Sequence, residues 1–143
     1  FPTLEFRMAD ICTRVDEAIC IASLVVGITG KLIKLRRSNL SWRPYRHHMI
    51  TENKWRAVRY GIEGQLVDCG KEKEVPARFL AMELLEFIDD VADELEIREE
   101  INYLHTIMKE GTSADRQLNV YRKTGDLKAV VDHLIEETCA GID

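Results

Sequence analysis

Two charged side chains near the start of the chain have the types and the spacing that phosphate and metal chemistry uses. Glu5 and Arg7 alternate with Leu4, Phe6 and Met8, which is the period of two expected for a β-strand with one buried face. On such a strand the two charged side chains would share the other face, about 7 Å apart. A carboxylate beside a guanidinium can hold a metal ion and a phosphate together, although an ordinary exposed ion pair has the same pattern.

Three further side chains with anion-binding chemistry fall in the segment ENKWRAVRYG, residues 52–61. A helix over this segment would place Asn53 and Arg56 on one face and Arg59, beside Trp55, on another. Two guanidinium groups can clamp a carboxylate or a phosphate through paired N–H donors. Taken by itself, however, the periodicity favours an ordinary solvated helix face.

Arg116 lies in the segment EGTSADRQL, residues 110–118, which has the composition of a helix N-terminus. Free N–H groups at such an end attract anions, and Arg116 would add positive charge there. A serine cap explains the same residues without any ligand. Both interpretations stay open at this point.

Positive charge is concentrated in the first half of the chain. Residues 1–60 hold 11 Lys and Arg against 5 Asp and Glu, whereas residues 61–143 hold 9 against 20. The stretch 31–48 contains six of these cations, Trp42, Tyr45 and two histidines, and no acid. Cations interleaved with aromatic residues can bind nucleic acid or a phosphate-bearing substrate. Cations are also favoured at the C-terminal end of a helix, which is the preferred interpretation.

The composition is that of one globular domain. The 143 residues are 45% hydrophobic and 31% charged, which is enough to bury a core. Four cysteines without C-x-x-C spacing predict reduced thiols in a cytoplasmic protein. No zinc-site histidine spacing, P-loop or Rossmann glycine motif occurs. The longest apolar run, 18–28, is shorter than the roughly 20 residues that span a bilayer, so no membrane segment is expected.

The pattern predicts a mostly α-helical chain with one N-terminal strand and a possible small hairpin within 62–76. Helices are expected over 14–37, 47–60, 77–95 and 96–110, followed by two more that begin at the caps Ser113 and Asp126. Thr13 opens a capping-box pattern for the first of these. A lone strand has no ladder partners. The chain is therefore expected to be a fragment of a larger α+β fold, and to self-associate as a homodimer or higher oligomer.

The order of three segments, TLEFR, ENKWRA-RYG and GTSADRQL-VY, resembles the C-terminal part of the glutamate–cysteine ligase type 2 family, the bacterial carboxylate–amine ligases. The resemblance covers essentially all of residues 1–143 as one structural unit. It implies a glutamine-synthetase-like fold with an antiparallel sheet whose upstream strands are missing here. It also implies ATP and Mg²⁺ as cofactors, and glutamate and cysteine as the carboxylate and amine substrates.

The same resemblance implies roles for the residues named above. Glu5 would ligate Mg²⁺, and Arg7 would contact the transferring phosphate or the substrate carboxylate. Asn53, Arg56, Arg59 and Arg116 would line the cofactor site. Because a single carboxylate holds Mg²⁺ poorly, the chain alone is expected to be inactive. The alternative is a non-enzymatic helical module for binding or oligomerisation, with weak nucleic-acid binding through 31–48, whereas the ligase interpretation expects no nucleic-acid partner.

Overall fold

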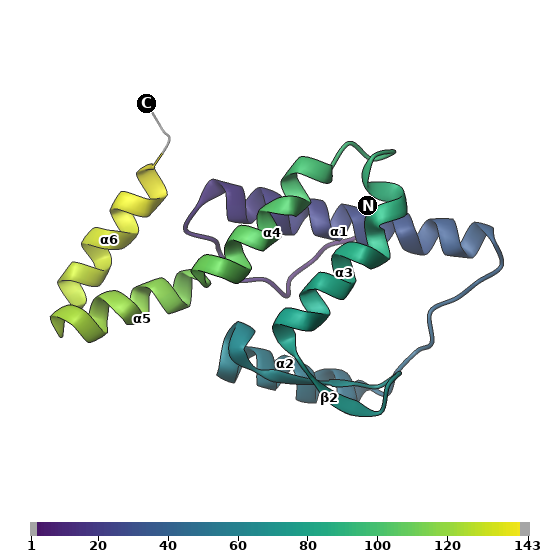
Figure 1. Cartoon of the computed structure of the whole chain (residues 1–143), viewed down its shortest axis with the longest axis horizontal. Helices are drawn as coiled ribbons and strands as arrows, with labels where there is room; N and C mark the ends of the chain where they lie inside the picture. The colour runs from purple at the N-terminus through teal and green to yellow at the C-terminus, as the bar shows by residue number, and fades with distance from the viewer. Residues whose placement is uncertain (1–2, 141–143) are drawn as a thin grey trace.

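The computed structural model describes residues 3–140, which form six α-helices, a short 3-10 helix and a two-stranded antiparallel sheet (Figure 1). The expectation of a mostly helical chain with a small hairpin is confirmed. In chain order the elements are α1 (Val15–Arg37), α2 (His47–Tyr60), η1 (Gly61–Glu63), β1 (Gln65–Asp68), β2 (Lys73–Pro76), α3 (Ala77–Ala92), α4 (Arg98–Glu110), α5 (Ser113–Thr124) and α6 (Leu127–Cys139).

The prediction of a strand at the start of the chain is wrong. Residues 3–12 of the described chain adopt no strand or helix, and Leu4 and Met8 are 75% and 78% exposed. Within residues 3–140 the only strand pairing joins β1 to β2. An isolated strand has no neighbouring strand with which its N–H and C=O groups can form hydrogen bonds. The alternating pattern alone therefore does not make this segment a strand.

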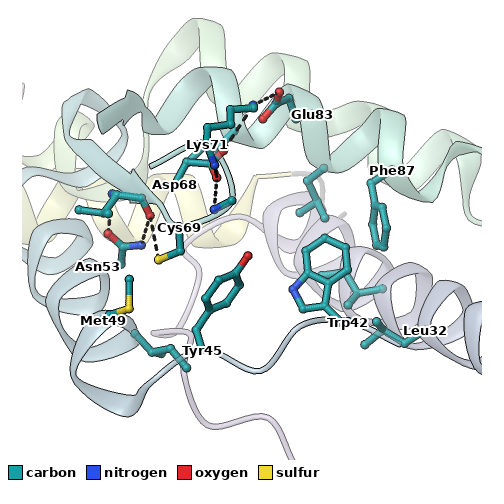
Figure 2. Close-up of a pocket in the computed structure, with 16 residues that line it drawn as sticks. Leu32, Trp42, Tyr45, Met49, Asn53, Asp68, Cys69, Lys71, Glu83 and Phe87 are labelled. Carbon is teal, nitrogen blue, oxygen red and sulfur yellow. Dashed lines mark hydrogen bonds and ion pairs between the residues drawn. The ribbon is translucent and has the colours of Figure 1, made fainter. Parts of the chain in front are cut away.

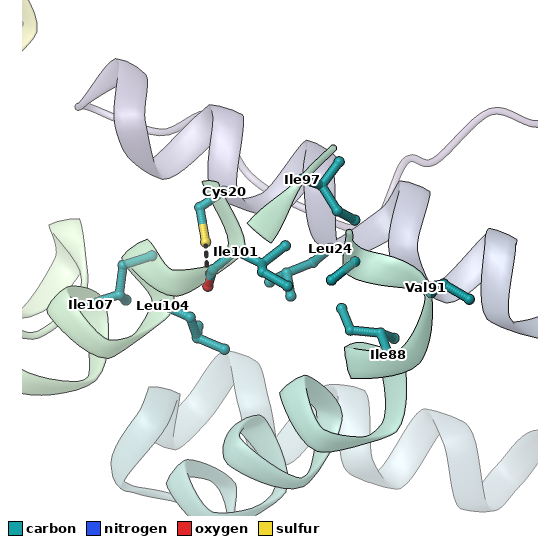
Figure 3. Packing of buried hydrophobic residues seen from close by; sticks show 9 residues of the cluster. Cys20, Leu24, Ile88, Val91, Ile97, Ile101, Leu104 and Ile107 are labelled. Carbon is teal, nitrogen blue, oxygen red and sulfur yellow. Dashed lines mark hydrogen bonds between the residues drawn. The ribbon is translucent and has the colours of Figure 1, made fainter. Parts of the chain in front are cut away.

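The core lies where α1 packs against α3 and α4 (Figure 3). Its buried members are Cys20, Leu24, Ile88, Val91, Ala92, Ile97, Ile101, Leu104 and Ile107. Gly27 faces this cluster, and a Cβ atom there would lie 2.8 Å from Cδ1 of Ile88. The glycine therefore allows α1 to approach α3 closely, because a side chain at this position would force its neighbour to move.

The opposite face of α1 is exposed and apolar. Val15, Ile19, Val26 and Ile33 follow one helical stripe and are each more than 40% exposed. By length and composition alone, α1 could cross a membrane, so the expectation that this segment is too short does not hold for the whole helix. The core helix of a soluble protein passes the same test, and α1 contributes its other face to the core. The expected absence of a membrane segment stays a prediction.

Helices α5 and α6 pack mainly against each other and extend from one side of the molecule (Figure 1). Thr112, and not Ser113, is the N-cap of α5, and it forms a capping box with Asp115. Asp126 caps α6 as expected, accepting a hydrogen bond from the N–H of Lys128. The box expected at Thr13 does not form, since Arg14 is the N-cap residue of α1 and caps it with no side-chain hydrogen bond.

The four thiols should differ sharply in reactivity. Burial raises the pKa of Cys20 to about 11, whereas Cys139 is exposed. The thiolate is the reactive form. At pH 8 we therefore expect a colorimetric disulfide reagent to modify Cys139 rapidly and Cys20 only after denaturation. A Cys139→Ser variant should lose the fast phase, and fast modification of Cys20 in the folded chain would contradict its position in the core.

Candidate functional site

Glu5 and Arg7 lie side by side without a strand to hold them. Nε of Arg7 donates to Oε1 of Glu5 at 2.8 Å and Nη2 donates to Oε2 at 3.0 Å. The two side chains are 68% and 81% exposed. This planar, bidentate arrangement is the one in which guanidinium groups also recognise phosphates and substrate carboxylates. Both groups can therefore be reached from solvent, and each could exchange its present partner for a ligand.

Asn53 joins helix α2 to the hairpin. Its Nδ2 donates to the carbonyl oxygen of Val67 at 2.8 Å, and the N–H of Val67 donates to its Oδ1 at 2.7 Å. The amide thus satisfies both backbone groups of Val67 in β1, as a neighbouring strand would. A helix face that looked solvated in sequence is in fact the contact surface between α2 and the sheet.

Arg56 makes a second connection between the same two elements. Its Nε donates to Glu52 at 2.7 Å within α2, and its Nη1 donates to Glu74 of β2 at 2.8 Å and to the carbonyl oxygen of Gln65 at 3.3 Å. Arg59, by contrast, lies over the ring of Tyr60, 5.6 Å from its centroid. The structure therefore brings Asn53 and Arg56 together at the hairpin.

Removing the Asn53 amide should weaken the attachment of the hairpin. Asn53→Ala leaves the N–H and C=O of half-buried Val67 without partners, which we expect to lower the free energy of unfolding by about 1–3 kcal/mol. Lys54→Ala, at the exposed neighbouring position, is the matched control. Urea unfolding followed by circular dichroism measures both variants. Equal midpoints for the two would contradict the role given to Asn53.

A groove of about 770 Å³ opens between α1, the segment 38–46, α2, the hairpin turn and α3 (Figure 2). Most of its lining is apolar or aromatic, including Leu32, Trp42, Tyr45, Met49 and Phe87. The Trp42 and Phe87 rings meet edge to face with centroids 5.1 Å apart. Sequence reasoning missed this groove because its walls come from five separate segments, although the aromatic residues of the stretch 31–48 were a partial signal.

Polar groups gather at the hairpin end of the groove. The Asp68 carboxylate accepts hydrogen bonds from the N–H groups of Gly70 and Lys71, both at 2.9 Å. These backbone donors, Lys71 first, hold the pKa of Asp68 below its ordinary value. The Lys71 ammonium also pairs with Glu83 of α3. The end of the groove therefore presents a turn that is fixed by its own hydrogen bonds and ion pairs.

Two of the cations in the stretch 31–48 are neutralised by α3. Lys31 and Lys34 contact the carboxylate of Asp90 at 2.6 and 2.9 Å. The hydrogen bond from Lys31, followed by that from Lys34, lowers the pKa of Asp90 to about 2. The ammonium of Lys31 also lies 5.3 Å from the centroid of Phe87. Part of the basic stretch thus serves the packing of α1 on α3.

Arg116 is the centre of a buried ion-pair cluster. Its Nε donates to Glu137 of α6 at 2.9 Å and its Nη1 donates to the carbonyl oxygen of Gly111 at 2.9 Å. Nη2 forms an ion pair with Glu17 of α1 at 2.7 Å, outside hydrogen-bond geometry. The side chains of Arg116, Glu17 and Glu137 are 10%, 7% and 9% exposed. All three nitrogens of the guanidinium therefore face protein partners.

Arg14 extends this cluster to the surface. Its Nη2 contacts Glu137 at 2.6 Å and its Nη1 contacts Glu110 at 2.8 Å. Together, Arg14 and Arg116 connect the start of α1 with the ends of α4 and α6. Sequence reasoning could not find these partners, because Glu137 and Arg14 are 123 residues apart.

The cluster should make stability depend on pH in the acid range. Burial alone would raise the pKa of Glu137, but hydrogen bonds from Arg116 and Arg14 outweigh it and hold the pKa below the ordinary 4.5. A carboxyl group whose pKa is lower in the folded state stabilises the fold above pH 4.5, and this contribution is lost as the pH falls below it. Thermal unfolding between pH 7 and pH 3 should show a smaller acid-induced loss in Glu137→Gln than in the parent chain. Identical slopes would contradict this assignment.

The described residues do not by themselves form a magnesium site. Within residues 3–140 no group of three or more His, Cys, Asp or Glu side chains is arranged to hold a metal ion. Glu5 offers one carboxylate, which is already paired with Arg7. Mg²⁺ takes octahedral oxygen coordination with help from carboxylates, water and substrate phosphates. Glu5 could therefore supply at most one of its ligands.

Comparison with known proteins identifies relatives over nearly the whole chain. Residues 1–133 match a family model described as "Glutamate-cysteine ligase family 2(GCS2)". Three proteins named "Putative glutamate--cysteine ligase 2" are similar to this chain. They come from Solibacter usitatus, Herpetosiphon aurantiacus and a Roseiflexus species, and they are 54%, 52% and 53% identical to this chain. Each alignment covers 99% of this chain but only 37%, 37% and 38% of the relative.

No solved structure matches this chain. The chain spans a little over a third of the length of the relatives that it matches. The family match nevertheless extends from residue 1 to residue 133 and so includes Glu5, Arg7, the helix α2 and Arg116. The chain therefore belongs to the glutamate–cysteine ligase family 2.

Proposed function

We propose that this chain is part of an ATP-dependent carboxylate–amine ligase that joins glutamate to cysteine. The observation that carries the proposal is the family match over residues 1–133, together with about 50% identity to proteins named as ligases of this kind. Four free cysteines in the described chain are compatible with the reducing cytoplasm as its location.

The proposed reaction has two balanced steps. An oxygen of the substrate carboxylate first attacks the terminal phosphorus of ATP, which forms an acyl phosphate and releases ADP. The amine nitrogen then attacks the acyl carbon, an amide bond forms, inorganic phosphate leaves and the nitrogen loses a proton. Both steps need cations beside phosphoryl oxygens and close alignment of the reacting atoms.

Arg7 is the residue best placed for this task. Its guanidinium is exposed, it is already oriented toward a carboxylate, and it can present two parallel N–H donors to a phosphoryl group or to the substrate carboxylate. Glu5 holds that guanidinium in place and could contribute one ligand to Mg²⁺. The other ligands would have to come from outside the described residues.

The other candidate residues would act at a distance from the reacting atoms. Asn53 and Arg56 fix the hairpin against α2 and so shape the wall of the groove. Arg59 is exposed and could reach a phosphate. Arg116 is engaged by Glu17 and Glu137, which supports a positioning role for it in place of direct cofactor contact.

The chain alone is proposed to be inactive, because the relatives are almost three times as long. The test measures ADP release that depends on ATP and Mg²⁺, with glutamate and cysteine as substrates. It compares this chain with a longer protein, in which the upstream region of a full-length relative is fused to the start of this chain. Activity in the longer protein only is the expected result. No activity in either protein would overturn the proposed function. Activity of this chain by itself would contradict the proposal that the chain alone is inactive.

A further inference from the structure

Helices α5 and α6 form an arm, residues 113–139, that is packed separately from the core of the molecule (Figure 1). The two helices contact each other far more than they contact the rest of the chain. Within the part of the chain that the structure describes, no residue of the arm belongs to the buried apolar cluster or to the apolar side chains packed around it. Apolar burial in the core therefore does little to hold the arm in place.

Polar contacts attach the arm to residues 13–17, at the start of α1. They pair Thr13 with Ser113, Arg14 with Glu137 and Glu17 with Arg116. We call these three contacts the latch. Its two ion pairs are 2.6 and 2.7 Å long, and the first contact joins two hydroxyl groups. One short stretch of the chain therefore holds the arm against the core.

The covalent connection between the arm and α4 consists of Gly111 and Thr112. Gly111 has a φ of +89°, in a region that glycine enters readily. Helices α5 and α6 have 12 and 13 residues, a length at which a helix without tertiary contacts is only marginally stable in water. An arm released from the latch would therefore also lose its helices, and the N–H groups of both would become accessible to solvent.

We propose that the arm opens as one unit at Gly111 and Thr112 while α1, α3 and α4 stay folded, and that the latch sets how often it opens. Proteins open locally in contiguous units, and the units that open most easily make few buried apolar contacts with the rest of the molecule. The arm has this character, since its buried contacts with the core are polar. The inference does not depend on the proposed ligase activity.

Amide hydrogen exchange at pH 7, followed by mass spectrometry, tests the proposal on the chain. In the parent chain the N–H groups of α5 and α6 should exchange together, at least about tenfold faster than the slowest N–H groups of α1, α3 and α4. Arg116→Met removes the central cation of the latch and should speed exchange in both arm helices by about a hundredfold or more. Arg122→Met, at an exposed position of α5, is the matched control and should leave the rates unchanged.

A core variant separates opening of the arm from unfolding of the whole chain. Ile88 is fully buried, and Ile88→Val should speed exchange of the slowest core N–H groups about twofold to tenfold. Exchange in the arm should not change, because the open state keeps the core intact. Three results would each overturn the proposal: arm and core exchanging at one rate, an arm that Ile88→Val accelerates as much as the core, or an arm unaffected by Arg116→Met.

Discussion

Replacing Arg116 by methionine is expected to lower the free energy of unfolding by about 3–5 kcal/mol, the typical effect of removing one partner from a buried ion pair. Methionine keeps much of the side-chain volume but leaves the carboxylates of Glu17 and Glu137 buried without their main cation. Arg122→Met, at an exposed position of the same helix, is the control and should change stability by less than about 0.5 kcal/mol. Urea unfolding of both variants measures the difference.

A double variant separates the ion pair from simple packing. If Arg116 acts through Glu137, then Arg116→Met combined with Glu137→Gln should be less destabilising than the sum of the two single changes. Strict additivity would show that the two side chains do not stabilise each other. A loss of less than 1 kcal/mol in Arg116→Met would show that water, not protein, compensates the two carboxylates.

Replacing Arg7 by alanine is expected to lower the turnover of the longer ligase about a hundredfold to a thousandfold, as for loss of a donor that stabilises developing charge. The side chain is 81% exposed, so the melting temperature should not change. Arg7→Lys keeps the charge but loses the planar pair of donors, and it should recover only part of the activity. Initial rates of ADP release with saturating glutamate and cysteine measure all three proteins.

Two further variants give this prediction its controls. Glu5→Gln should also lower turnover, because it removes the carboxylate that orients the guanidinium and that could ligate the metal ion. Arg122→Ala, another exposed arginine, should leave turnover unchanged. An Arg7→Ala enzyme within threefold of the parent would exclude Arg7 from the reaction and leave the pair as a surface ion pair.

The helices could be predicted from the sequence because their signals are local. The bounds of α2 were predicted from the break at Pro44 and the stop at Gly61, and α4 ends before Gly111, whose φ of +89° suits glycine. The opening strand could not be settled in the same way. Strand formation requires a partner strand, and an alternating pattern says nothing about whether that partner is present.

The candidate site was predictable to the extent that its residues are close in sequence. Glu5 and Arg7 were expected side by side on a strand that does not form, and they meet instead in an irregular segment, whereas the shared face of Asn53 and Arg56 follows from helical spacing alone. What those residues contact did not follow, since Val67 and Glu74 approach α2 only when the hairpin folds back. The partners of Arg116 were out of reach for the same reason.

The Asn53 amide blocks the addition of another strand at one edge of the hairpin. It occupies the N–H and C=O of Val67, and Arg56 takes the neighbouring carbonyl of Gln65, so β1 has few main-chain groups left for an incoming chain. An open sheet edge can pair with a strand from another chain. Here helix α2 covers one of the two edges of the sheet, the edge formed by β1. A strand from elsewhere in a longer protein that joined this two-stranded sheet would therefore have to pair with β2.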